Sequence, residues 1–147
     1  MKFYIMLLLA GNLCFSACNA RQNAAQQKTT TTTQKTQKQN TMDLSKISDE
    51  TVKQAISALQ SGDKLWYTYF TENPVMTDDG NTIDFKNFFE KALGTEHFIS
   101  IDKVENEGKE VYGNFKAGQW GTFKVFFKFH KNEHGKFDRL DIGQAKY

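Results

Sequence analysis

The sequence predicts an α+β domain in which helices come first along the chain and long strands follow. From Ser48 to Gly94, apolar residues recur at the spacing of amphipathic helices. After Gly94 they alternate with polar residues, as in strands that bury one face, and glycine-bearing turns separate these runs. Helices followed by a meander of strands predict helices packed on one face of an antiparallel sheet.

Three helices and a short hairpin are expected up to Gly94. Each helix is predicted by a capping Ser or Asp at its start and by a helix-breaking Gly or Pro at its end. The predicted boundaries are, in order, Ser48 to Gly62, Asp63 to Pro74, and Asp84 to Gly94. Between the last two helices, 75–77 is predicted as a strand and Asp78 to Asn81 as its hairpin turn.

Four long strands are expected after Gly94, at 97–104, 110–116, 119–130 and 136–144. In the third of these strands one face should look toward the helices, and its apolar residues are Phe123, Val125, Phe127 and Phe129. The opposite face carries Trp120 and Phe126 among lysines. Two large apolar groups on a charged face are typical of a modest two-fold interface, so Trp120 and Phe126 predict a homodimer face.

The N-terminal segment has the layout of a secretory signal peptide. Lys2 precedes an apolar run over 3–10, which is too short to span a bilayer because a span needs about 20 apolar residues. The run Phe15-Ser-Ala-Cys18 resembles the lipobox of bacterial lipoproteins, which implies cleavage before Cys18 and lipid on its sulfur. An ordinary signal-peptidase cut after Ala20 is the alternative, and a buried core helix is a weaker one.

The segment 19–42 is predicted to be a disordered tether. It has no aromatic residue, no acidic residue and no glycine, so it cannot bury enough apolar area to offset its ordering entropy. The expected organisation is a lipoprotein signal peptide at 1–17, lipidated Cys18 with its tether at 18–42, and a folded domain at 43–147. The exported chain would be lipid-anchored to the inner or outer membrane of a bacterial cell envelope, with the domain facing the periplasm or the exterior.

Charge and motifs exclude several classes of function for the domain. Residues 43–147 hold 14 Lys and Arg against 17 Asp and Glu, a net charge of −3, which argues against a nucleic-acid partner. The three histidines, His97, His130 and His134, lack metal-ligand spacing, so no metal site is expected. No glycine-rich phosphate loop or nucleophile motif occurs in the sequence, and no cofactor is expected.

The order of the segments resembles the nuclear-transport-factor-2-like superfamily, which includes SnoaL-like and ketosteroid-isomerase branches. Four runs carry the resemblance, which covers essentially all of 44–145: Gln60 to Asp63, Phe70 to Gly80, Gly121 to Phe129 and His134 to Ile142. The resemblance implies a cone-shaped domain, in which a curved sheet wraps helices around a pocket, often as a dimer. Because this fold hosts enzymes, transport factors and binding modules, the site must decide the function.

Asp78 matches the position of the catalytic base in the isomerase branch. The two positions of that branch that stabilise the oxyanion fall at Ala55 and Val125, neither of which has a side-chain donor. Isomerase chemistry is therefore not expected, and a structural role of Asp78 in its turn is the simpler explanation. The residues expected to line a ligand pocket around Asp78, or else to fill the core, are Trp66, Tyr69, Phe70, Phe89, Phe123, Val125 and Phe127.

The first functional hypothesis is a non-catalytic, membrane-tethered module of the cell envelope. It would hold a small apolar or amphipathic ligand in the cone, or a partner protein on the outer sheet face. One alternative is a SnoaL-like enzyme with Asp78 as general base, and another is a structural dimeric envelope subunit. An open pocket with Asp78 at its floor and a polar group nearby would favour the enzyme, whereas a filled cone would favour the structural subunit.

Overall fold

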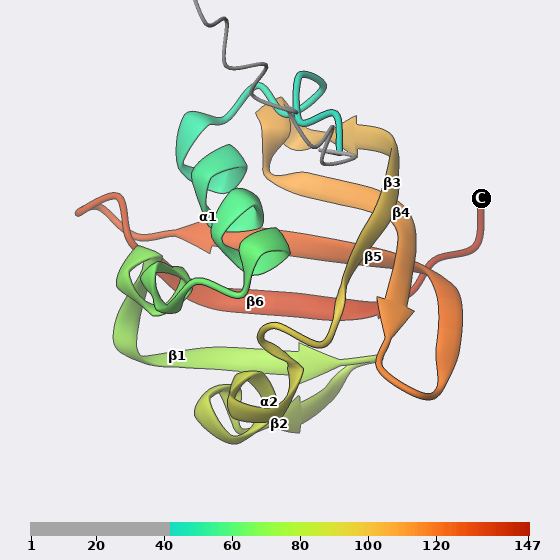
Figure 1. Cartoon of the computed structure of the whole chain (residues 1–147). Helices are drawn as coiled ribbons and strands as arrows, with labels where there is room; N and C mark the ends of the chain where they lie inside the picture. The colour runs from blue at the N-terminus through green and yellow to red at the C-terminus, as the bar shows by residue number, and fades with distance from the viewer. Residues whose placement is uncertain (1–41) are drawn as a thin grey trace, which may run out of the picture. The chain divides into compact units, whose positions relative to one another are not determined.

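The computed structural model describes residues 42–147. The predicted signal peptide, Cys18 and the tether up to residue 41 lie outside the described residues. The helices and strands follow one another as shown in Figure 1. In chain order they are α1 (Glu50–Ser61), the 3₁₀ helix η1 (Lys64–Tyr69), β1 (Phe70–Asp78), β2 (Asn81–Ile83), α2 (Phe85–Ala92), β3 (His97–Glu105), the 3₁₀ turn η2 (Asn106–Gly108), β4 (Glu110–Ala117), β5 (Gly121–Lys131) and β6 (Phe137–Gln144). Among these helices none is both long and apolar enough to cross a bilayer.

Aspartate caps begin all three N-terminal helices. The carboxylate of Asp49 accepts a backbone N–H of the first turn of α1, so Asp49 is the N-cap where Ser48 was predicted. The side chains of Asp63 and Asp84 accept backbone N–H groups at the starts of η1 and α2, as predicted. Gly62 ends α1 with a φ of 67°, a left-handed conformation that glycine adopts without steric cost.

The second helix and the strand after it differ from the prediction. The helix is a 3₁₀ helix that ends at Tyr69, and Pro74 lies inside β1. The pairing of β1 with β6 is interrupted between Phe70 and Val75, and β2 pairs only with the stretch from Met76 to Asp78. Proline is tolerated here because neither neighbouring strand needs a backbone N–H at this position.

The sheet has six strands in the order β2-β1-β6-β5-β4-β3. All neighbours are antiparallel except β1 and β6, which are parallel, so the prediction of a wholly antiparallel sheet was wrong at this pair. Alternation along a strand shows which face is buried but not which distant strand it joins. The register between β3 and β4 shifts twice, and such bulges bend a sheet. In Figure 1 these two strands turn away from the direction of β5 and β6, and the sheet curves around α1.

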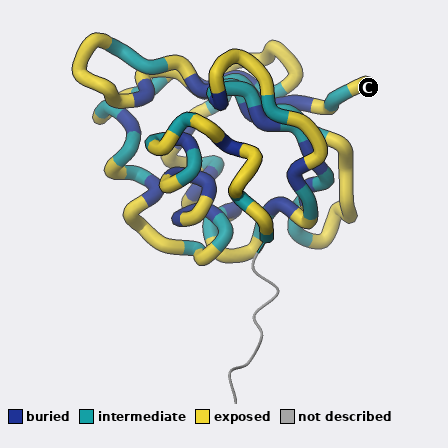
Figure 2. Tube along the Cα trace, turned by 90° about the horizontal axis from the view of Figure 1, so that it is seen from above, coloured by how far each residue is buried: buried dark blue, intermediate teal, exposed yellow. Residues whose placement is uncertain are grey.

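An aromatic cluster forms the core between the helices and the sheet. At its centre Trp66 is fully buried, with ring centroids of Phe70 at 4.8 Å and Phe89 at 4.7 Å. The other rings near Trp66 belong to Phe85 and Phe129, and Phe137 packs on Phe129. Figure 2 shows buried segments gathered in the interior and exposed residues along the outer turns. Burying rings of this size supplies much of the hydrophobic stabilisation of a small domain.

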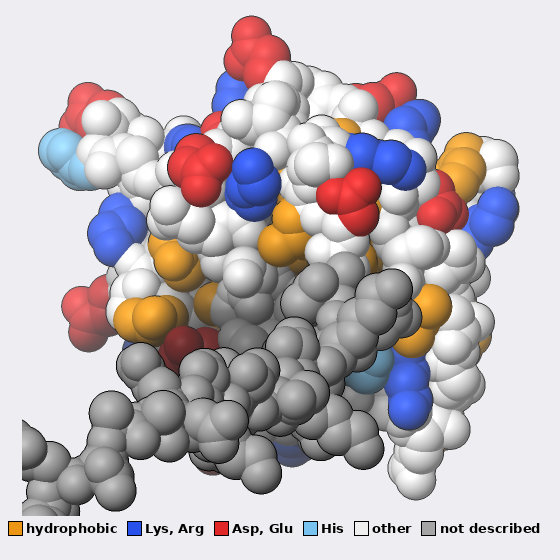
Figure 3. Space-filling model, turned by 45° about the horizontal axis from the view of Figure 1, so that its top comes forward, with side chains coloured by type: hydrophobic (Ala, Val, Ile, Leu, Met, Phe, Trp, Pro, Cys, Tyr) orange, Lys and Arg blue, Asp and Glu red, His pale blue; other side chains and the backbone are white. Residues whose placement is uncertain are grey.

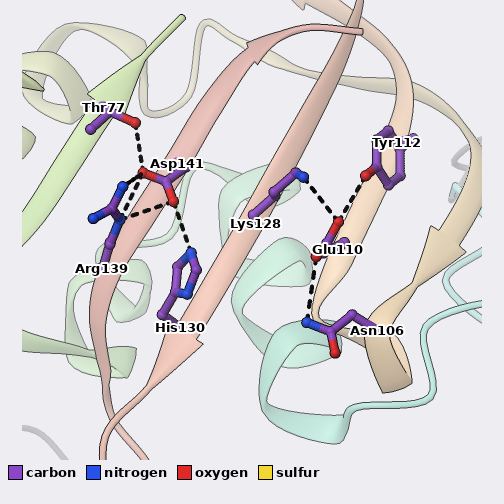
Figure 4. A network of polar contacts seen from close by, with 8 residues as sticks. All are labelled: Thr77, Asn106, Glu110, Tyr112, Lys128, His130, Arg139 and Asp141. Atoms are coloured by element: carbon purple, nitrogen blue, oxygen red, sulfur yellow. Dashed lines mark hydrogen bonds and ion pairs between the residues drawn. The ribbon is translucent and has the colours of Figure 1, made fainter. Parts of the chain in front are cut away.

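The outer face of the sheet carries partnered charges (Figure 4). Asp141 accepts hydrogen bonds from Thr77 at 2.6 Å and Arg139 at 2.9 Å, and lies 2.8 Å from the ring of His130. Burial alone would raise the pKa of Asp141, but these partners together hold that pKa below its usual value. Glu110 has three partners of its own, Asn106, Tyr112 and Lys128.

Candidate functional site

A cavity of about 420 Å³ opens where β1, β4 and β6 end and β5 begins. We call it the acidic hollow. It is lined by Asp78, Asp79, Phe88, Glu96, Phe115, Ala117, Trp120, Phe123, Val125, Phe127, Ile142, Gly143 and Gln144. No Lys or Arg is among these lining residues. The cavity therefore combines apolar walls with acidic side chains and has no basic side chain in its lining.

The aromatic side chains that line the hollow differ widely in solvent exposure. Phe127 is 1% exposed, Phe123 is 38% exposed and Trp120 is 76% exposed. Phe88 adds a half-buried ring from α2, and Phe115 adds a buried one from β4. A ligand would thus meet Trp120 at the mouth and Phe127 at the floor.

The backbone places Asp78 at the hollow. Asp78 is the last residue of β1 and pairs with β2 on one side and β6 on the other. The next two residues, Asp79 and Gly80, have φ values of 46° and 85°, which make the tight hairpin turn that was predicted. The Asp79 carboxylate accepts the backbone N–H of Gln144 at 2.8 Å, which fastens this turn to the end of β6.

Glu96 brings a second carboxylate to the hollow. It follows α2, where its backbone N–H donates to Ala92 at 2.8 Å, and immediately precedes β3. Its side chain reaches the β4–β5 turn, where Oε1 lies 3.5 Å from the position that a Cβ on Gly118 would take. No prediction from the sequence included Glu96, because a lone Glu between a helix and a strand has no distinguishing pattern.

The two carboxylates lie in an unfavourable electrostatic environment. Within residues 42–147, neither the Asp78 nor the Glu96 carboxylate makes a hydrogen bond or an ion pair. Burial, and then the charge of Asp79, raise the pKa of Asp78. Burial, and then the charge of Asp78, raise the pKa of Glu96. Both effects disfavour the charged forms of Asp78 and Glu96.

A second cavity of about 430 Å³, the adjoining hollow, shares four residues with the first. The shared residues are Asp78, Phe88, Glu96 and Trp120. Its other wall comes from α2 and includes Asn87 and Lys91. Among the described residues no group of three or more metal-ligating side chains is close enough to hold an ion.

The structure divides the predicted lining residues into two groups. Asp78, Phe123, Val125 and Phe127 come together in the acidic hollow. Trp66, Phe70 and Phe89 lie instead in the aromatic core, and Tyr69 packs partly buried against that core. η1 places Trp66 under α2, where ring packing with Phe89 excludes it from either hollow.

Trp120 does not share the outer sheet face with Phe126. β5 begins at Gly121, and residues 118–120 form the turn before it, so the strand alternation predicted from Gln119 does not include Trp120. Gly118, with a φ of 48°, starts this turn, which closes with a 2.9 Å hydrogen bond from the Trp120 N–H to Ala117. Phe126 lies on the outer face, near Tyr112 and Lys128.

The overall arrangement is shared with solved structures of low sequence identity. A protein from Sphaerobacter thermophilus matches with a TM-score of 0.54 at 14% identity, over 69% of this chain and 99% of that one. A SnoaL-like protein of unknown function from Burkholderia thailandensis matches with a TM-score of 0.50 at 13% identity, over 68% and 98%. The epoxide hydrolase/cyclase-like enzyme SalBIII, of pyran ring formation in the polyether salinomycin, matches with a TM-score of 0.50 at 16% identity, over 65% and 88%.

The domain has the nuclear-transport-factor-2-like fold. The likeness establishes the fold alone, because the identities are low. By sequence, neither the protein-family models nor the curated proteins give a match.

In this nuclear-transport-factor-2-like domain, neither predicted oxyanion position offers a donor. Val125 lines the acidic hollow, whereas Ala55 is fully buried in the core and is not part of the lining. The three aromatic side chains of η1 that could donate instead, Trp66, Tyr67 and Tyr69, lie outside both hollows. The Trp66 Nε1 is buried without a hydrogen-bond partner among the described residues. The side-chain donors that do line the acidic hollow are Trp120 and Gln144.

Removing the charge of Glu96 should stabilise the domain. Because its pKa is raised on folding, the folded state loses stability as pH rises above the ordinary carboxyl pKa. At pH 7, Glu96→Gln should raise the melting temperature by about 1–4 °C, a modest effect because solvent screens a half-open site. The gain should vanish near pH 3, where both states are protonated.

Glu110→Gln is the matched control with the opposite sign. The partners of Glu110 outweigh its burial and lower its pKa, so its stabilisation is present at pH 7 and is lost as pH falls. Thermal melts from pH 3 to 8 compare the two variants with the wild type. A Glu96→Gln variant that melts below the wild type at pH 7 would contradict the assigned environment of Glu96.

Proposed function

We propose that this chain is a ligand-binding protein of the cell envelope, which holds a small apolar or amphipathic molecule in the acidic hollow and has no catalytic role. The observation that carries the proposal is the hollow itself, with its aromatic walls and its two carboxylates without protein partners. Its volume of about 420 Å³ lies within the range of small-molecule sites, which is about 300–1,000 Å³. A domain with a purely structural role gains no stability from such a site.

The second part of the proposal concerns location. The lipobox-like run ending at Cys18 supports a lipid anchor, and the polar composition of 19–42 supports a tether between that anchor and the domain. The resemblance to a lipobox implies three acyl chains on the modified cysteine, which would hold the protein on a membrane much more firmly than one chain. A tethered domain would meet ligands close to the membrane surface, where amphipathic molecules concentrate.

Filling the hollow should weaken ligand binding. The neutral probe N-phenyl-1-naphthylamine should bind the full-length protein with a Kd on the order of 10–100 μM, as expected for a ligand of its size. Val125→Trp places a large ring in the hollow and should weaken binding at least about tenfold. Probe fluorescence measures both affinities.

Lys124→Trp is the matched control, because Lys124 neighbours Val125 in β5 but is exposed and is absent from the lining. It should bind the probe as the wild type does. Equal binding by wild type and both variants would show that the probe sits elsewhere and would remove the main support for the proposal.

Cys18 is the proposed attachment site of the lipid. Cells expressing the wild-type chain should incorporate labelled palmitate into it, and Cys18→Ala should carry no label. Cys14→Ala should remain labelled, because Cys14 lies in the segment that is cut away. Label that persists in Cys18→Ala would refute this site.

A general-base enzyme is the second candidate, and the raised pKa of Asp78 in a cavity favours it. SalBIII shows that an enzyme occurs among proteins of similar fold. Against it stands the lack of a matched oxyanion site, since losing one such donor typically costs about 3–4 kcal/mol of transition-state stabilisation. Binding without turnover therefore remains the better account of these residues.

Solvent deuterium exchange into enolisable ketones separates the two candidates. The binding proposal predicts no exchange above the buffer rate for the wild type or for Asp78→Asn, as followed by proton NMR. Exchange by the wild type that disappears in Asp78→Asn would establish the enzyme and overturn the non-catalytic proposal.

A further inference from the structure

Partly buried carboxylates occur in two different environments in this domain. On the outer sheet face, Asp141 and Glu110 each contact several side-chain donors or cations (Figure 4). In the acidic hollow, Asp78 and Glu96 have no such contact within residues 42–147, although lysines are plentiful in the sequence. On the surface shown in Figure 3, side chains of both signs are interspersed. The lining of the acidic hollow, in contrast, includes carboxylates but no Lys or Arg.

A carboxylate that is partly buried and has no partner destabilises the folded protein. Asp78 and Glu96 also lie close enough for the charge of one to act on the other. Asp79 adds a third negative charge, but its carboxylate is engaged by the Gln144 N–H. A cation that enters the hollow would relieve the repulsion and supply the missing partner for both groups.

The walls of the hollow suit an organic cation better than a metal ion. Aromatic side chains line it from α2, β4, β5 and the turn before β5, and include Phe88, Phe115, Trp120 and Phe123. Aromatic faces attract ammonium groups and also bury apolar substituents. Ca²⁺ takes six to eight oxygen ligands, more than two carboxylates provide, and the described residues hold no group of three or more side chains that could together ligate a metal ion.

The charged groups around the site leave it net negative. Asp78, Asp79 and Glu96 line the acidic hollow, and the adjoining hollow adds Asp84 and the single cation Lys91. Lys91 belongs to the last turn of α2, where a cation interacts favourably with the helix dipole. A ligand carboxylate would meet repulsion here, and a neutral ligand would leave the two acidic groups unpaired.

We infer that the ligand of the acidic hollow carries a positively charged nitrogen, as a protonated or quaternary amine, on an apolar body. Asp78 and Glu96 contact the charge, and the aromatic walls take the apolar part. This inference rests on the proposed function, because it specifies the chemistry of the ligand at the same site.

Three probes of similar size and different charge test the inference on the full-length protein. They are the cation benzyltrimethylammonium, its neutral carbon isostere neopentylbenzene, and the anion 3-phenylpropionate. The readout is the indole N–H signal of Trp120 in NMR, assigned with Trp120→Phe. The sequence has two tryptophans, and the second, Trp66, is fully buried. The cation should bind about tenfold or more tightly than the isostere, and the anion should bind most weakly.

Charge-neutral variants identify the groups responsible. Glu96→Gln and Asp78→Asn should each reduce the preference for the cation several-fold. Neither variant should bind neopentylbenzene more weakly than the wild type, because a neutral ligand gains nothing from the carboxylate charge. Glu133→Gln makes the same charge change in the exposed β5–β6 turn and should keep the full preference. Circular dichroism of each variant verifies folding.

The outcomes distinguish a failure of the cationic-ligand inference from a failure of the proposed binding function. Equal affinities for the cation and the isostere would contradict the inference that the ligand is a cation, but would not contradict the proposed binding function. A preference for the cation that survives in both Glu96→Gln and Asp78→Asn also overturns the inference. Failure of all three probes to shift Trp120 overturns the binding function itself and the inference with it.

Discussion

The parallel pairing of β1 with β6 is the constraint on which the rest of the domain depends. At one end of the pair Phe70 lies opposite Phe137, inside the aromatic core around Trp66. At the other end Asp78 lies opposite Ile142, at the acidic hollow. A single strand thus joins the part of the domain that supplies hydrophobic stabilisation to the part that holds the candidate site. The Asp79 carboxylate also accepts the backbone N–H of Gln144, so strand pairing and this hydrogen bond together hold Asp78 in place.

The aromatic core and the candidate site occupy different parts of the sheet, and the charged groups of the candidate site reduce stability. Large rings pack between η1, α2 and the sheet, where Trp66 and Phe89 are fully buried. At the acidic hollow, partly buried carboxylates remain without partners among the described residues, and their raised pKa values mean that the charged forms destabilise the fold at neutral pH. Functional sites commonly retain such unfavourable groups because a ligand supplies the missing interaction.

Local sequence signals predicted local structure well. Capping by Asp63 and Asp84, the turn after Asp78 and the four long strands were all predicted, because each follows from capping, turn chemistry or alternation within a few residues. Features that depend on distant pairing were missed. To predict these features, one must know the register between segments that are far apart in the sequence. They are the parallel pairing of β1 with β6, the place of Pro74 in β1, and the position of Glu96 beside the β4–β5 turn. Trp66 was expected at the pocket or in the core and Trp120 on the outer sheet face, and only the fold places Trp66 in the core and Trp120 at the hollow.

The pH titration of the side-chain carboxyl carbons, followed by ¹³C NMR with and without benzyltrimethylammonium, tests the central claim most directly. In the protein without ligand, Asp78 and Glu96 should titrate above the ordinary range of their residue types, whereas Asp141 should titrate below it. Saturation with the cation should lower the pKa of Asp78 and Glu96 and leave that of Asp141 unchanged, because a bound positive charge favours the ionised form. The claim that these two carboxylates form a cation-binding site would be contradicted if Asp78 and Glu96 had ordinary pKa values in the protein without ligand and the cation did not change them.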